Sequence, residues 1–190
     1  MSGQRRLTLS NRQGRRTLDL RLLRRIVRML LDDLLRVRQF DLGIYFVGAE
    51  EITRLNQTFL QHKGPTDVIT FDYAQPAEGE ERRAPVLRGG AKKAQRQKLP
   101  SSRGPASPPR QPELLYAEIF VCLDEALAQA RRFRTSWQSE LTRYVVHALL
   151  HLLGHKHEQA AAHRKMKRAE DRLLRQLARR FDLAKLSPPT

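Results

Sequence analysis

The chain of 190 residues contains one cysteine, few aromatic side chains and no long apolar run. The single cysteine, Cys122, excludes a disulfide framework and leaves too few thiolates for a cysteine-based zinc site. Aromatic residues form only 6% of the chain, so the sequence indicates no clear platform for stacking bases. No run reaches the roughly 18 apolar residues of a membrane-spanning helix. These absences favour a reducing, intracellular compartment and no membrane partner.

Acidic residues are also scarce, since 20 Asp and Glu accompany 36 Lys and Arg and leave a net charge of +16. This balance predicts a polyanionic partner, and nucleic acid is the first candidate. The first 20 residues are rich in arginine, which is compatible with a mitochondrial presequence. Leu7 and Leu9 favour a first short strand that leads into a helix instead.

Residues 76–112 differ from the rest because they hold seven of the ten prolines, four of the ten glycines and no aromatic residue. Nine basic and three acidic side chains lie in this segment. Such a composition predicts a disordered insertion, because it buries too little apolar surface to offset the entropy of ordering. It is either a tolerated surface loop or a basic tether for RNA. Residues 1–75 and 113–182 are then one folded domain, whose oligomeric state the sequence leaves open.

The folded part alternates between strand and helix patterns. Apolar periodicity predicts a helix over 18–37, capped by Thr17, with the stripe Leu23, Ile26, Leu30 and Leu34. Strands are predicted around Leu7 and over 42–47, 67–73 and 115–122, and further helices over 49–60, 124–133, 138–153 and 159–180. Most of the predicted strands lie in the first part of the chain and the longer helices in the last part, which indicates an α+β fold.

The segment HALLHLLGHKH, residues 147–157, carries the chemistry. His147 and His151 lie four residues apart, so one helix face presents both imidazoles to a shared metal ion. Gly154 can end the helix in a left-handed conformation and let His157 reach the same ion. Three neutral imidazoles leave one tetrahedral position open, which is typical of a catalytic zinc site. Imidazole also suits nickel and other divalent ions.

Three other histidines are candidate site residues. His155 could compete as a ligand at a less favourable spacing, His163 is expected to be solvated on the last helix, and His62 could face the site from the loop before Pro65. The residue after the first histidine is Ala148, where a zinc peptidase needs a glutamate base, so peptide hydrolysis is disfavoured.

Three blocks of the sequence resemble the YbeY family of single-strand-specific endoribonucleases and rRNA maturation factors. HALLHLLGHKH is similar to its signature H-G-x-x-H-L-x-G-Y-D-H. LNQTFLQHKGPTDVITFDY resembles its L-N segment followed by P-T-D-V-L-S-F, and AEIFVC resembles its G-D-I-x-I-C strand. The blocks stand in the family's order between about Leu7 and Arg180.

The resemblance implies a mixed four-stranded sheet packed with about five helices. It implies one Zn²⁺ per chain, held by His147, His151 and His157. It further implies cytoplasmic endoribonuclease activity on single-stranded RNA, maturation of the 3′ end of small-subunit rRNA, and ribosome quality control, with rRNA and the ribosome as partners.

The sequence departs from the family at several positions. Many members carry an arginine four residues after the L-N asparagine, thought to act on the phosphate, and Leu60 stands there. Lys63 and His62 are the nearest substitutes, although lysine lacks the planar fork of arginine. Together with Arg143 they are the candidate RNA-binding residues.

Other residues have open roles. Thr66, Asp67 and Thr70 either line the cleft or cap the following strand, and Glu118 either orients a ligand histidine or lies exposed on its strand. We expect Cys122 to be a core residue.

Three functions remain open. The first is a zinc endoribonuclease. The second is a metal-stabilised assembly factor that binds rRNA without cutting it, which Leu60 favours. A metal-free basic adaptor is a further alternative that metal analysis would decide.

Overall fold

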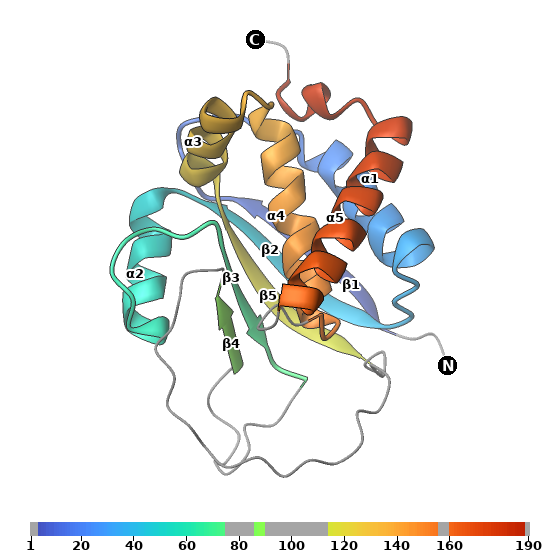
Figure 1. Ribbon diagram of the computed structural model, residues 1–190, viewed down its shortest axis with the longest axis horizontal. Helices are drawn as coiled ribbons and strands as arrows, with labels where there is room; N and C mark the ends of the chain where they lie inside the picture. The colour runs from blue at the N-terminus through green and yellow to red at the C-terminus, as the bar shows by residue number, and fades with distance from the viewer. Residues whose placement is uncertain (1–3, 75–85, 90–113, 156–159, 189–190) are drawn as a thin grey trace.

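The computed structural model of the protein describes residues 4–74, 86–89, 114–155 and 160–188. A mixed sheet runs through the centre of the molecule in the order β1-β2-β5-β3-β4 (Figure 1). Its strands are β1 Arg5–Asn11, β2 Phe40–Val47, β3 Val68–Asp72, β4 Val86–Gly89 and β5 Leu115–Cys122. The first three strands in that spatial order are mutually parallel, and β3 is antiparallel to both of its neighbours.

The helices separate into two layers. The elements are α1 Leu20–Met29 with a π-helical turn over Leu30–Leu34, α2 Ala49–Leu60, α3 Leu123–Phe133, α4 Trp137–Leu152, α5 Ala160–Arg180 and a short 3-10 helix over Leu183–Leu186. Figure 1 shows α1, α4 and α5 side by side across one face of the sheet. Helix α2 packs on β3 and β5, where its buried Ile52 belongs to a different apolar cluster from that beneath α4.

Alternation along the strands builds these two cores. Ala117 and Ile119 of β5 face the larger cluster beneath α1, α4 and α5. Phe120 and Cys122 face the smaller cluster beneath α2. Because successive side chains of a strand point to opposite faces, the central strand β5 supplies both cores.

The α+β class, the mixed sheet and the five helices predicted from the sequence are confirmed, and the four predicted strands are all present. A fifth strand, β4, lies inside the segment 76–112 and pairs antiparallel with β3. Within that segment, the four residues Val86–Gly89 extend the sheet at its edge. The rest of that segment lies outside the described residues, and the domain boundaries remain a prediction.

The first helix differs from its expected form at both ends. Asp19, not Thr17, caps α1, because its Oδ1 accepts hydrogen bonds from the backbone amides of Arg21 and Leu22 at 2.9 Å each. Regular α-helix ends at Met29, and the predicted continuation to residue 37 is replaced by the π-helical turn.

Among the described residues, no helix is both long enough and apolar enough to cross a membrane.

Candidate functional site

Helix α4 positions the two central histidines. Ser136 caps its N-terminus by accepting a hydrogen bond from the amide of Ser139. Most of the helix is buried between the sheet, α3 and α5, which fixes its rotation about its own axis. His147 and His151 lie in its last two turns.

The two imidazoles converge. Nε2 of His147 lies 3.0 Å from Nε2 of His151, and the ring planes meet at 73°. His151 is buried and the side chain of His147 is 22% exposed. Metal–nitrogen bonds of about 2.0–2.1 Å allow one ion to contact both atoms after a small adjustment, so this pair fits the first two ligands of a metal centre.

Glu170 on α5 holds the outer nitrogen of His147. Its Oε2 lies 3.1 Å from Nδ1 of His147, which assigns the Nδ1–H tautomer and leaves Nε2 as the ligand atom. Carboxylates commonly orient metal-binding imidazoles in this way. Burial raises the pKa of Glu170, but hydrogen bonds from His147 and Arg143 outweigh it and hold that pKa at about 2.

Glu170 is not among the site residues predicted from the sequence. A signal was present, because Glu170 lies on the same helical stripe as the apolar side chains of Met166, Leu173 and Leu177. A carboxylate on an apolar stripe needs a buried partner. That this partner is His147 depends on how α4 and α5 cross, and the sequence pattern alone does not predict the crossing.

Arg143, predicted to bind RNA, lies within this carboxylate network. Its Nη1 donates to Glu170 Oε1 at 2.8 Å and to Asp171 Oδ1 at 3.0 Å, and its Nε lies 3.5 Å from Glu140 Oε2. Its side chain is 28% exposed. These contacts give the guanidinium a structural role in joining α4 to α5.

The end of α4 has the predicted geometry. Gly154 adopts φ +86°, and its amide donates to the carbonyl of His151 at 2.9 Å. The amide of His155 then donates to the carbonyl of Leu150 at 3.0 Å, which completes a Schellman motif. Burial, together with the charges of Lys165 and Arg172, lowers the pKa of His155.

His157, the predicted third ligand, lies outside the described residues. Within the described ranges no group of three or more His, Cys, Asp or Glu side chains is arranged to hold a metal ion. The described part of the predicted centre is therefore the His147–His151 pair and its supporting carboxylate. His163 is exposed on α5, as expected.

Glu118 lies on the opposite face of the sheet from α4, so it does not orient the histidines. Its carboxylate accepts hydrogen bonds from the hydroxyls of Tyr45 at 3.0 Å and Tyr73 at 2.8 Å. The alternation that places Ala117 and Ile119 under α4 turns Glu118 away. Burial and the bond to Glu118 raise the pKa of both tyrosines.

The candidate phosphate-binding residues follow α2. Leu60 is its last residue and packs against the smaller core. His62 and Lys63 are exposed, and the His62 ring contacts the carbonyl of Leu60 through Nδ1 at 2.6 Å. In the described structure neither residue hydrogen-bonds or pairs with His147 or His151. Lys63 forms no ion pair there, so its ammonium group is accessible to an anion.

The remaining sequence candidates have local structural contacts. Thr66 Oγ1 donates to Asp67 Oδ1 at 3.1 Å. Asp67 Oδ1 also accepts a hydrogen bond from the amide of Val68 at the start of β3. Thr70 is buried. Cys122 is fully buried, and burial raises the pKa of its thiol to about 11. This supports its assignment to the core.

Comparison with known proteins gives a consistent result. The family model described as "Endoribonuclease YbeY" matches residues 8–178. The endoribonuclease YbeY of Chlorobium luteolum is 28% identical over 165 residues, which cover 87% of this chain and 93% of that protein. The endoribonuclease YbeY of Salinibacter ruber is 32% identical over 133 residues, which cover 70% of this chain and 68% of that protein.

The fold is also similar to a solved structure. The solution structure of TM1509 from Thermotoga maritima aligns with a TM-score of 0.55, covering 97% of this chain and 99% of that one at 20% identity. The family match extends over both parts of the chain that flank the insertion, and includes the histidine helix and most of α5. The chain therefore belongs to the YbeY family of endoribonucleases.

Proposed function

We propose that this protein is a zinc-dependent, single-strand-specific endoribonuclease of the cytoplasm that matures the 3′ end of small-subunit rRNA and takes part in ribosome quality control. Membership of the YbeY endoribonuclease family supports the reaction class. The observation that carries the metal dependence is the approach of His147 Nε2 to His151 Nε2, with Glu170 fixing the first imidazole.

The donor set fits one Zn²⁺ per chain, held by His147, His151 and His157. A metal ion in that position supplies positive charge for a phosphate oxygen and lowers the pKa of water. Helix α4 keeps the two imidazoles one turn apart, and the contact with Glu170 places the proton of the neutral His147 imidazole on Nδ1. The turn at Gly154 reverses the chain directly after the helix, before His157.

The protein's cations bind and orient the RNA. Lys63 is the nearest candidate for the phosphate contact that the family's arginine makes, with His62 beside it. A lysine offers one point charge instead of a planar fork, so it holds a phosphate less rigidly. Arg143 is engaged by Glu170 and Asp171, and its proposed contact with RNA is correspondingly the weaker one.

Elemental analysis of the purified protein beside His151→Ala tests the metal centre. We expect about one zinc per chain in the wild type and its loss in the variant, while His163→Ala, which removes an exposed histidine of α5, keeps its metal. A folded wild type that takes up no metal when zinc is supplied contradicts the proposal.

A second function is a metal-stabilised assembly factor that binds rRNA without cutting it. Leu60 in place of the family arginine favours it. Turnover of single-stranded RNA separates the two functions. An endoribonuclease cleaves it and loses cleavage in His147→Ala at unchanged RNA affinity, whereas an assembly factor binds the same RNA and releases it intact.

A further inference from the structure

Helix α5 has two different faces. Met166, Glu170, Leu173 and Leu177 are buried against the rest of the fold. The opposite face carries basic side chains that line an open groove of about 740 Å³. Its lining consists of His155, Ala161, Arg164, Lys165, Arg168, Ala169, Arg172 and Arg175. We call this surface the α5 groove.

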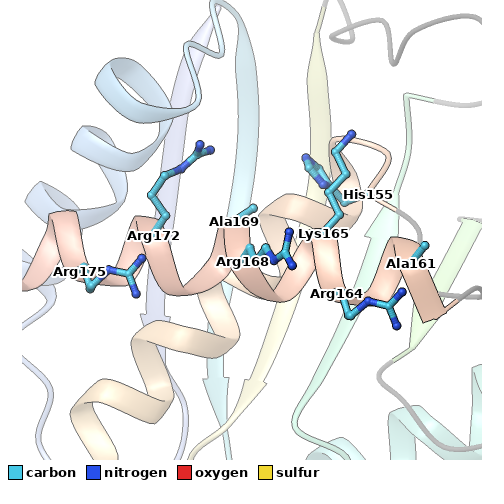
Figure 2. Close-up of a pocket in the computed structure, with 8 residues that line it drawn as sticks. All are labelled: His155, Ala161, Arg164, Lys165, Arg168, Ala169, Arg172 and Arg175. Atoms are coloured by element: carbon cyan, nitrogen blue, oxygen red, sulfur yellow. The ribbon is translucent and has the colours of Figure 1, made fainter.

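The cations of the α5 groove share one side of the helix. At 3.6 residues per turn, its five Arg and Lys side chains fall within about 100° around the axis. Figure 2 shows Arg164, Arg168 and Arg175 following one another along α5, with Lys165 and Arg172 beside them. All five are exposed.

These five side chains form no ion pair within the described ranges, in contrast to Lys167 of the same helix. Lys167 lies 3.4 Å from carboxylate oxygens of both Glu170 and Asp171. Both acidic residues of α5 are thus engaged by Arg143, His147 and Lys167. No carboxylate lines the groove, so its charge is available for an external anion.

The α5 groove borders the turn that ends the histidine helix α4. His155 lines it and follows His151 by one Schellman turn, with its amide bonded to Leu150. From Arg164 to Arg175 the groove then extends for about 16 Å, at 1.5 Å per residue. That length corresponds to about five nucleotides of a stacked strand at 3.4 Å each.

We propose that the α5 groove binds the sugar–phosphate backbone of RNA on one side of the cleavage position. The partner is a single strand of RNA held by charge and without base readout, because the lining is dominated by guanidinium and ammonium groups and contains no Phe, Tyr or Trp side chain. The inference rests on the proposed function, to which it adds a second contact region outside the histidine centre.

The test is the double substitution Arg168→Ala/Arg172→Ala, with Arg131→Ala/Arg132→Ala on α3 as the control. Both remove two exposed arginines, and the α3 pair lies outside the groove. Affinity for a single-stranded RNA of about 30 nucleotides is measured by fluorescence anisotropy from about 50 to 200 mM salt. A gel confirms that the RNA stays intact during the measurement.

We expect the groove variant to bind about tenfold more weakly, with a salt slope smaller by about 1.4, which is the loss of two phosphate contacts on a single strand. The control variant loses much less RNA affinity, and Arg168→Lys/Arg172→Lys, which keeps both charges, retains most of the wild-type affinity. An equal loss in the control and groove variants overturns the proposal. So does unchanged RNA affinity combined with lost binding to phosphatidylserine vesicles, which assigns the groove to a membrane surface.

The binding assay needs neither metal nor turnover, so it decides the role of the α5 groove even if the protein does not cut RNA. Zinc content and cleavage decide the proposed function separately. If the protein does cut, KM for the 30-nucleotide RNA rises with the groove substitutions by about the factor seen in binding.

Discussion

At the scale of single residues, Glu170 links the histidine pair to the rest of the fold. It is buried and contacts His147, Arg143 and Lys167, so one carboxylate joins a candidate ligand histidine of α4 to two cations. A buried carboxylate without such partners would destabilise the fold. The low pKa of Glu170 shows that its hydrogen bonds and nearby cations stabilise the charged form.

Glu170→Gln should weaken metal retention while the fold persists. Glutamine has nearly the same shape but lacks the charge that orients His147, and loss of such supporting contacts costs roughly 10–100-fold in metal affinity. Competition with a chromogenic chelator measures the change. Asp171→Asn is the matched control, because Asp171 pairs with Arg143 and Lys167 and makes no contact with His147. Equal affinity in the two variants contradicts the role given to Glu170.

The Tyr45–Glu118–Tyr73 cluster predicts an alkaline limit to stability. Since both phenol pKa values are raised in the folded protein, the unfolded chain ionises first, near pH 10, and stability falls as the pH rises above that value. The drop in Tm from about pH 9 to about pH 11 should be smaller in Tyr45→Phe/Tyr73→Phe than in the wild type. Tyr116→Phe, on the same strand as Glu118, serves as the control, and identical pH profiles for all three proteins contradict the prediction.

At the scale of secondary structure, the turn after α4 controls where the chain goes beyond His151. Gly154 has φ +86°, and an added Cβ there meets no atom within 4 Å. Glycine is therefore required at position 154 by the left-handed backbone conformation, and not by crowding from neighbouring atoms.

Gly154→Ala should destabilise the fold by about 1 kcal/mol, because a left-handed backbone strains any residue with a Cβ. Urea denaturation measures the free energy of unfolding. Gly14→Ala is the control, since its Cβ also meets nothing and its φ is not in the left-handed region. If both variants lose the same stability, the Schellman motif does not depend on glycine.

The elements themselves were largely predictable from the sequence, and the contacts between them were not. Period-two and period-3.6 patterns located every strand but β4, and they placed His147 and His151 on one helix face. Glu118 was assigned two possible roles because a strand pattern gives alternation without saying which face meets α4. Asp19 and Thr17 are both good capping residues, and only the backbone geometry selects Asp19.

At the scale of the whole molecule, the long segment between β3 and β5 enters and leaves the sheet at one point. The amide of Tyr73 donates to the carbonyl of Tyr116 at 2.8 Å, and the two rings lie 5.1 Å apart. β3 and β5 pair antiparallel directly below these residues. The two ends of this segment therefore lie side by side in the folded domain.

Replacing residues 76–112 with a short Gly-Ser linker should preserve cooperative unfolding. The shorter loop regains about 1 kcal/mol of closure entropy, which partly offsets the loss of the edge strand β4. Urea denaturation and zinc content test this, and a broad, non-cooperative transition contradicts the single-domain assignment. RNA affinity of the same variant decides between a tolerated loop, which leaves it unchanged, and a basic tether, which lowers it.

The position of β5 between β2 and β3 also has a consequence for synthesis of the chain. Its two neighbours are translated first, and neither can complete its pairing until residues 115–122 leave the ribosome. At about 5–20 residues per second, translating residues 76–112 extends that interval by about 2–7 s. During this time the open edges of β2 and β3 are exposed to other nascent chains, so we expect the protein to depend on chaperones while it is being made.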